Sequence, residues 1–181
     1  MSNILHAAGQ MQLSAEARVL LRPDMAARDA VQALIDAGRP RDALKLLARL
    51  LPTRYAVAWL CQCARGEALS EEDALGVALA EAWVRESKEE HRRAALDYAA
   101  AAGRRSIGTW LAVAVAWSGG SLAPLGSQTP VPPAEHLTAS AAVATINLLA
   151  SLVMDQFAAR RDAFVQAALG LLPTSTEQME A

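Results

Sequence analysis

The fold class is decided by residues 70–103, which read SEEDALGVALAEAWVRESKEEHRRAALDYAAAAG. Ser70 and the three acidic residues after it are typical of a capped helix N-terminus, where carboxylates complement the positive end of the helix dipole. Apolar residues then recur at the three- and four-residue spacing of one helix face. Ser87 and Glu90 form a capping box that opens a second helix, and Gly103 is placed to end it. This stretch therefore predicts two consecutive helices.

Similar signals extend over the rest of the chain. Asp24 is expected to cap a helix that ends at Gly38, and another helix follows it. Residues 53–65 are apolar on almost every side, which is typical of a central helix. Thr138 is expected to cap one long final helix from residue 139 to about residue 171. The chain has 41 alanines and 25 leucines against 15 valines plus isoleucines. These features predict an all-α protein, a compact bundle of about seven helices with a long central helix at its C-terminal end.

The domain organisation is simple. The 181 residues are enough for one compact helical domain, residues 1–181, in which residues 1–12 and 173–181 are expected to fray. The residues around 24–51 resemble the helical hairpin of tetratricopeptide arrays, but the pattern does not recur one period of about 34 residues later. A proline-rich connection, residues 119–137, precedes the final helix. Connections longer than about 12–15 residues are uncommon in compact domains and are often functional.

Two interpretations of the 119–137 connection remain open. As a structural strap it would pack on the bundle, and Val131 together with Leu122 or Leu125 would be buried beneath it. As a binding segment it would be extended and stiff because of its prolines, and it would expose those side chains to a partner. The residues expected to contact such a protein partner are Leu122, Pro124, Pro130, Val131, Pro132 and Pro133.

The sequence offers little for catalysis, metal binding or cofactor binding. Its three histidines are scattered along the chain, and no zinc-type spacing of cysteine and histidine occurs. Cys61 and Cys63 lie two residues apart on one predicted helix, so they do not face each other, and that helix offers no base to activate them. The Ser-Gly-Gly-Ser segment at 118–121 lacks the spacing of a phosphate loop or of a nucleophile elbow. We therefore expect no catalytic residue, no metal site and no cofactor.

Charge and hydropathy limit the class of partner. The formal net charge of −2 gives no general electrostatic reason to expect nucleic-acid binding. The longest apolar run, residues 139–154, is shorter than the roughly 20 residues that span a bilayer, and it contains polar residues such as Asn147. The N-terminus lacks the pattern of a signal peptide, and two cysteines are too few for a secreted disulfide scaffold. These observations predict a cytoplasmic protein that neither binds nucleic acid nor inserts into a membrane.

Two groups of apolar residues bear on assembly. The four tryptophans lie on apolar helical stripes and are expected to be buried core anchors; they are Trp59, Trp83, Trp110 and Trp117. An exposed tryptophan would instead indicate a binding hot spot. The apolar arc of the final helix is wider than one neighbouring helix requires. Either other helices surround it within a monomer, or part of it forms the interface of a twofold homodimer.

Several segments resemble one family of uncharacterised bacterial helical proteins. The segments are LPTRYAVAWLC (51–61), EAWVR (81–85), WLAVA (110–114), WSGGSLAP (117–124), VPP (131–133) and HLT (136–138). They match the family patterns LPxRxAVxWxC, WSGGSxAP and VPP, and together they cover roughly residues 25–155. The family is a domain of unknown function associated with type VI secretion gene clusters. The resemblance implies an accessory or adaptor role and carries no catalytic residue to this chain.

Two functions follow as hypotheses. The first is a non-catalytic helical interaction protein, an accessory factor of a bacterial secretion system. The second is a small enzyme or toxin-like effector whose site is assembled from scattered polar residues. A concave polar pocket that gathers two or more of five residues would favour the second hypothesis; the five are Glu90, His91, Arg92, Ser121 and His136.

Overall fold

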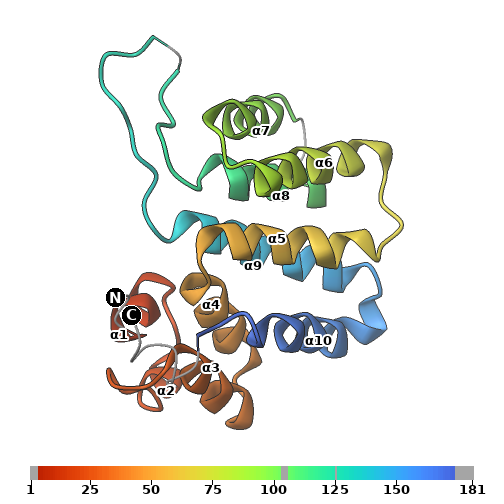
Figure 1. Cartoon of the computed structure of the whole chain (residues 1–181). Helices are drawn as coiled ribbons and strands as arrows, with labels where there is room; N and C mark the ends of the chain where they lie inside the picture. The colour runs from red at the N-terminus through yellow and green to blue at the C-terminus, as the bar shows by residue number, and fades with distance from the viewer. Residues whose placement is uncertain (1–3, 103–105, 125, 174–181) are drawn as a thin grey trace.

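The computed structural model describes residues 4–102, 106–124 and 126–173. In these residues the chain forms ten α-helices and one 3₁₀ turn, and it forms no strand (Figure 1). The all-α prediction is therefore confirmed. The helices are α1 (Ile4–Gln10), α2 (Ala15–Arg18), α3 (Ala27–Asp36), α4 (Pro40–Leu50), α5 (Thr53–Arg65), α6 (Glu71–Arg85), α7 (Glu89–Ala101), α8 (Ile107–Ala116), α9 (Leu137–Ser151) and α10 (Phe157–Leu169), with the 3₁₀ turn η1 (Met154–Gln156) between the last two.

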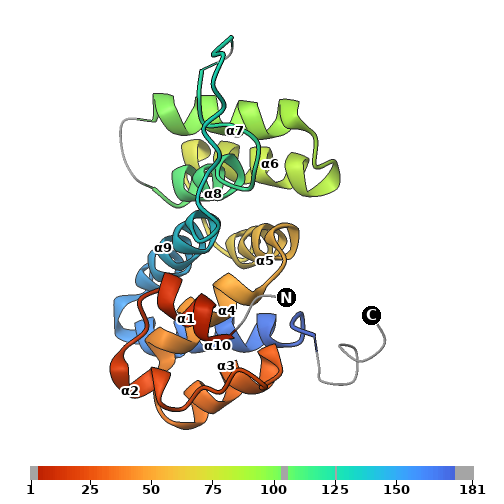
Figure 2. The same cartoon turned by 90° about the vertical axis from the view of Figure 1, so that its left-hand side faces the viewer.

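The helices are arranged around α9. Figures 1 and 2 show α6, α7 and α8 at one end of the molecule, α1 to α4 and α10 at the other, and α5 and α9 between them. Helix α9 packs against α4, α5, α8 and α10. Its residues Ala142, Ile146 and Leu149 are fully buried. The expected central helix is therefore present, and helices of the same chain surround it.

The prediction of one long final helix is wrong. Helix α9 ends at Ser151, and Val153 has the extended backbone angles φ −129° and ψ 88°, which interrupt the helical hydrogen bonds. At this break the chain turns by 118° into the segment Met154–Leu169, which contains η1 and α10. The turn places α10 against α4 and α9, so Val165 and Leu169 are buried in the same core. A continuous helix would have carried these apolar residues away from that core, which is why burial favours the break.

The cap expected at Thr138 is also wrong. The N-cap of α9 is His136, and the Thr138 hydroxyl instead donates a hydrogen bond to the Ala114 carbonyl of α8 over 3.2 Å. Thr138 is buried, and a buried hydroxyl needs a partner. Its side chain therefore joins α8 to α9 rather than ending a helix.

The other predicted caps divide into two groups. Ser70 caps α6 by accepting the Asp73 amide, and Gly38 ends the α3 segment with φ +66°, as expected. Ser87 is not the cap of α7, because its hydroxyl donates to the Trp83 carbonyl at the end of α6. Asp24 is not a cap either, since α3 begins only at Ala27. Ser87 thus lies close to the start of α7, but its side chain bonds to α6 instead. Asp24 lies three residues before the start of α3, too far to cap it.

Of the residues 1–12 that were expected to fray, residues 4–10 form helix α1, and residues 1–3 lie outside the described part of the chain. Helix α1 packs on α4 and buries Ile4, Ala7 and Ala8, and α2 is capped by Ser14. The Asp42 carboxylate of α4 accepts the Ser14 amide over 3.0 Å and its hydroxyl over 2.8 Å. These contacts hold α1 and α2 on the bundle, and with these two helices the described residues form more helices than the predicted seven. The expectation of a frayed tail at 173–181 falls on residues that, from 174 onward, lie outside the described part of the chain.

Helix α8 is held in a close crossing with α6. A Cβ atom on Gly108 would lie 2.5 Å from the Asp73 carbonyl oxygen, so only glycine allows this approach. The Asp73 carboxylate also accepts the Gly108 amide over 2.8 Å. Because the proline-rich connection starts at the end of α8, this crossing fixes its starting point.

In the described residues no single helix is long and apolar enough to cross a membrane; α9 and the η1–α10 segment pass that test only as a bent pair, by length and composition.

Candidate functional site

The most distinctive surface feature is the α8–α9 loop, residues 117–136, which projects from the bundle in Figures 1 and 2. It contains all six residues for which partner binding was expected. Leu122 and Pro133 are half-buried, and Pro124, Pro130 and Pro132 are exposed. Val131 is 51% exposed, unlike a residue beneath a packed strap. Leu125 lies outside the described residues.

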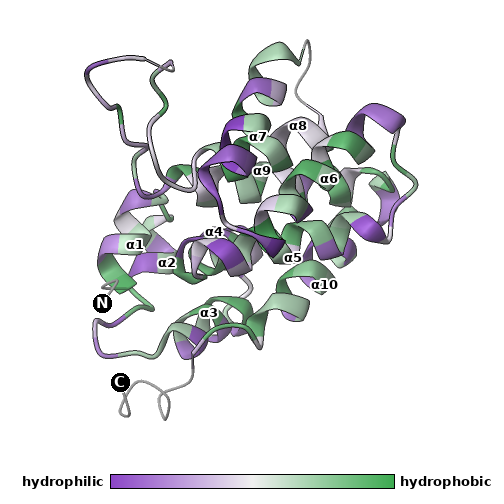
Figure 3. Cartoon of the chain, turned by 45° about the horizontal axis from the view of Figure 1, so that its top comes forward, coloured by the Kyte–Doolittle hydropathy of each residue, from purple (hydrophilic) through white to green (hydrophobic). Residues whose placement is uncertain are grey.

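The two arms of the loop are joined by backbone hydrogen bonds near its base. The Leu122 amide donates to the Val131 carbonyl over 2.8 Å. The Ser121 hydroxyl accepts the amides of Ala123 over 3.1 Å and of Val131 over 3.0 Å. Val131 is therefore held at both backbone polar groups while its side chain points into solvent. In Figure 3 the loop beyond this point carries both hydrophilic and hydrophobic residues.

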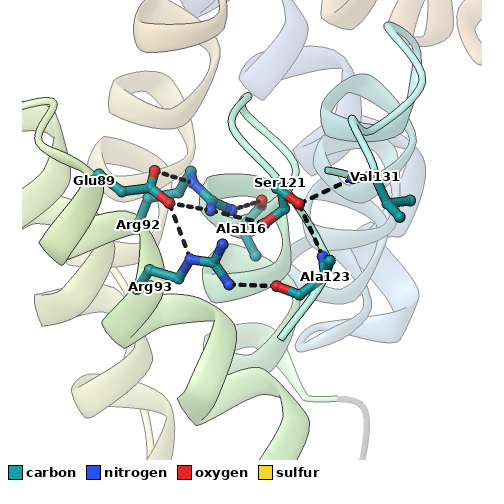
Figure 4. Close-up of polar contacts among 7 residues, drawn as sticks. All are labelled: Glu89, Arg92, Arg93, Ala116, Ser121, Ala123 and Val131. Atoms are coloured by element: carbon teal, nitrogen blue, oxygen red, sulfur yellow. Dashed lines mark hydrogen bonds and ion pairs between the residues drawn. The ribbon is translucent and has the colours of Figure 1, made fainter. Parts of the chain in front are cut away.

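Two arginines of α7 attach the base of the loop to the bundle (Figure 4). Arg92 donates to the Ala116 carbonyl over 2.8 Å and to the Ser121 carbonyl over 3.0 Å. Arg93 donates to the Ala123 carbonyl over 2.8 Å. We call Arg92 and Arg93, together with Glu89, the arginine clamp.

Glu89 balances the charge of the two arginines. It lies three and four residues before them on α7, so all three side chains share one helix face. Its carboxylate accepts from Arg92 over 2.5 and 2.6 Å and from Arg93 over 2.9 Å. The hydrogen bond from Arg92, supported by Arg93, lowers the pKa of Glu89 from 4.5 to about 2. Arg92 is only 3% exposed, and a cation this deeply buried requires such pairing.

Gly120 is the one position in the loop that the clamp restricts to glycine. Its φ is +63°, a left-handed conformation that other residues rarely adopt. A Cβ atom there would also lie 2.8 Å from Nε of Arg92. The paired glycines were expected only to end a helix; in the structure the second one also makes room for the buried guanidinium.

A cleft of about 420 Å³ opens beside the base of the loop. Its lining residues include Trp117, Gly120, Pro132 and Pro133 of the loop, and Arg49 of α4. Arg49 donates to the Glu135 carboxylate over 2.7 Å and to the Gln10 side chain over 2.7 Å. These contacts join the returning arm of the loop to α1 and α4.

The tryptophans divide into two pairs. Trp59 and Trp83 are 2% and 7% exposed, as expected for core anchors. Trp110 and Trp117 are partly buried and pack against the same core. Their rings meet edge to face with centroids 6.3 Å apart. Trp110 lies on α8 and Trp117 at its C-cap.

The five polar residues that would favour an enzyme site do not gather in one pocket. Arg92 and Ser121 come together, but through the Ser121 backbone, and the Ser121 hydroxyl is occupied by two amides. None of the five candidates lines the cleft beside Trp117. His91 is half-buried near Glu90, with 4.0 Å between His91 Nε2 and a Glu90 carboxylate oxygen.

The cysteines do not offer an activated thiol. Burial, with a smaller contribution from the Glu81 carboxylate, raises the pKa of Cys61 from 9.0 to about 12. Burial likewise raises the pKa of Cys63 to about 12. Both thiols are therefore protonated at neutral pH and are poor nucleophiles. In the described residues no group of three or more histidine, cysteine, aspartate or glutamate side chains is arranged to hold a metal ion.

The arginine clamp is the part of the site that the sequence analysis missed. The spacing Glu89, Arg92, Arg93 does indicate ion pairs on one helix face. The sequence does not show that both guanidinium groups also reach carbonyls 24 to 30 residues further along the chain. Those acceptors are brought near only when α7 packs on α8.

Comparison with known proteins identifies a family without an assigned activity. No curated protein and no solved structure matches the chain. A family model described as a family of unknown function (DUF6931) matches residues 30–172, a range that includes the arginine clamp and the whole α8–α9 loop. Because this match covers most of the 181 residues, the chain belongs to the DUF6931 family.

Proposed function

We propose that this protein is a non-catalytic interaction protein that binds a protein partner through the α8–α9 loop. The observation that carries the proposal is the combination of an exposed apolar side chain with a fixed backbone at Val131. Its side chain is 51% exposed, while its amide and carbonyl are both hydrogen-bonded within the loop. An apolar residue held in this way loses little conformational entropy when a partner covers it.

The chemistry of the loop indicates the kind of partner. Val131 stands between Pro130 and Pro132, and the side chains of all three are exposed. Prolines favour an extended backbone, and extended proline-containing segments dock into grooves lined by apolar and aromatic side chains. We therefore expect the partner to present such a groove.

The polar residues of the site favour binding over catalysis. Arg92 is occupied by Glu89 and by two backbone carbonyls, and the Ser121 hydroxyl is occupied by two amides. Groups saturated in this way hold a loop in position and are not free to act on a substrate.

The cellular role rests on the resemblance of the sequence motifs. The WSGGSLAP and VPP segments lie in the α8–α9 loop and resemble a bacterial family associated with type VI secretion gene clusters. We propose a cytoplasmic accessory or adaptor role in such a secretion system.

Affinity purification from the native host, followed by mass spectrometry, tests the proposal with two matched variants. Val131→Asp places a charge on the loop without removing the backbone hydrogen bonds at its base. Val19→Asp places the same charge on an 82% exposed valine at the other end of the molecule. We expect a partner that co-purifies with the wild type and with Val19→Asp but is lost with Val131→Asp. The proposal fails if no partner exceeds background, or if Val131→Asp retains the same partners as the wild type.

A further inference from the structure

A second cavity lies on the opposite side of α9 from the loop-bearing end, where α4, α9 and α10 converge. Its volume is about 330 Å³, near the lower end of the range of about 300–1,000 Å³ that is typical of small-molecule sites. It exists because the chain turns by 118° after α9 and directs the first two turns of α10 toward α4. We call it the α4–α9–α10 cavity.

Three cationic side chains line this cavity. Arg41 and Lys45 come from one face of α4, four residues apart, and Arg161 comes from α10. No carboxylate is among the lining residues in the described part of the chain. Like charges four residues apart on a helix destabilise it, so an anion between them would relieve a repulsion that the free protein carries.

Arg161 is the most deeply placed of the three. It is only 6% exposed, and its guanidinium contacts the neighbouring Asp162 carboxylate at 3.3 and 3.4 Å, at the long limit of a hydrogen bond. Its guanidinium also stacks over the Phe157 ring, with 5.5 Å to the ring centroid. The stacking fixes the direction of a side chain whose planar donors match an oxyanion.

The other two cations are closer to solvent. Arg41 is exposed, and Lys45 is half-buried and donates to the Gln12 carbonyl over 3.2 Å. The remaining walls are apolar, formed by Leu44, Val143 and Phe157, and Asn147 adds one amide group. The cavity therefore combines three cationic side chains with apolar walls.

We propose that the α4–α9–α10 cavity binds a small organic anion, in which a carboxylate or phosphate group is carried on an apolar body. The anionic group lies between Arg41, Lys45 and Arg161, and the apolar body contacts Leu44, Val143 and Phe157. A bare inorganic ion would leave the apolar walls uncovered, and a neutral apolar molecule would place no negative charge between the three cationic side chains. This site is separate from the α8–α9 loop and does not depend on the role proposed for it.

Isothermal titration calorimetry at low ionic strength tests the proposal with four probes. Phenyl phosphate and phenylacetate carry the two candidate anionic groups on the same ring, and they show which group is preferred. Inorganic phosphate lacks the apolar body, and benzyl alcohol lacks the charge. We expect one saturable site for phenyl phosphate or phenylacetate, with a dissociation constant at least about tenfold lower than for either incomplete probe.

Two double variants of equal net charge locate the site. Arg41→Gln/Lys45→Gln removes two cations from the cavity, and Arg18→Gln/Arg28→Gln removes two exposed cations elsewhere. We expect the first to raise the dissociation constant of the bound probe by about tenfold or more, and the second to change it by less than about twofold. Circular dichroism melting confirms that each variant is folded, and the single variant Arg41→Gln replaces the double variant if loss of the Lys45 contact unfolds it.

Three results would overturn the proposal. The first is the absence of saturable binding of either aromatic anion up to about 10 mM. The second is equal weakening in both double variants, which would indicate general charge attraction. The third is equally tight binding of benzyl alcohol, which would indicate an apolar site without anion recognition.

Discussion

Single side chains connect distant parts of this chain. Trp59 of α5 is 2% exposed, and its indole Nε1 donates to the Phe164 carbonyl of α10 over 3.0 Å, 105 residues further along the sequence. Arg92 connects α7 to the end of α8 and to the loop after it. Each of these side chains is buried and also makes a hydrogen bond to a distant backbone carbonyl. Each therefore stabilises the fold both by packing and by hydrogen bonding.

Replacement of Trp59 by alanine tests this double role. Loss of a buried aromatic ring leaves a cavity and here also removes the indole hydrogen bond to the Phe164 carbonyl, so we expect Trp59→Ala to lower the free energy of unfolding by about 3–5 kcal/mol. Tyr55→Ala on the same helix is the control, because Tyr55 is 53% exposed, and we expect a change of about 0.5 kcal/mol or less. Urea denaturation measures both. Equal midpoints for Trp59→Ala and the wild type would contradict the assignment of Trp59 to the core.

The carboxylate of Glu89 gives the clamp a pH dependence. Its pKa falls from 4.5 to about 2 on folding, so its contribution to stability is complete above pH 4.5 and is lost as the pH falls toward 2. The side chain is 56% exposed, and solvent screening limits that contribution to about 1 kcal/mol or less. We expect Glu89→Gln to be less stable than the wild type at pH 6 and equally stable near pH 2.

Denaturation at a series of pH values measures the difference. Glu90→Gln is the matched control, since Glu90 is adjacent and 72% exposed and does not contact the clamp arginines in the structure. A stability difference for Glu89→Gln that does not change between pH 6 and pH 2.5 would show that the carboxylate charge is not what stabilises the clamp.

The α8–α9 loop behaves as one element with two parts. Its base is hydrogen-bonded across the two arms and to α7, whereas its outer residues 126–130 are exposed. This division explains how a connection without helix or strand positions Val131 at a defined point. It also explains why neither the packed strap nor the freely extended segment describes the loop as a whole.

Hydrogen exchange of individual amides measures that division. We expect slow exchange at Leu122, Ala123 and Val131, whose amides are hydrogen-bonded, and fast exchange at Gln128. Gly120→Ala should accelerate exchange at the three base amides, because its Cβ meets Arg92.

The control for that experiment is Gly126→Ala. Gly126 also has a positive φ, +86°, but a Cβ atom there meets nothing within 4 Å, so we expect the base amides to keep their slow exchange. Fast exchange at all loop amides of the wild type would show that the base is not ordered, and it would remove the structural basis for a preorganised binding residue.

At the scale of the whole molecule, helices of the same chain pack around α9. Helices α4, α5, α8 and α10 surround it, as the monomer interpretation of its wide apolar arc requires. The larger exposed apolar residues are dispersed over different elements, among them Val19, Leu75, Val131 and Met154. Dispersed apolar residues do not form the contiguous patch of a stable homodimer.

We therefore expect the protein to be a monomer at micromolar concentration. Light scattering coupled to size-exclusion chromatography should give a mass close to 19.1 kDa. A mass of about twice that value would indicate a twofold homodimer. In that case Leu152→Asp tests the exposed end of the α9 segment, because Leu152 is 47% exposed and its substitution does not disturb the core.

The sequence by itself determined the features that depend on neighbours within a few residues. The cap at Ser70 and the left-handed end at Gly38 are local, and so are the helical stripes that made the all-α class predictable. The non-helical backbone at the prolines of the connection also follows from local preference, since a proline beyond the first turn disrupts a helix. These features were predicted because the hydrogen bonds or the steric limits involved close within one or two turns.

Other features were decided only by the tertiary structure, because packing between helices outweighed the local sequence preference. The residues after Ser151 keep an apolar pattern, yet the chain breaks at Val153 because folding back buries α10 on α4 and α9. The arginine clamp and the α4–α9–α10 cavity likewise join residues from separate helices, and their charges meet only after those helices pack. Burial of apolar area and pairing of buried charge are properties of the whole fold, so no short window of sequence contains them.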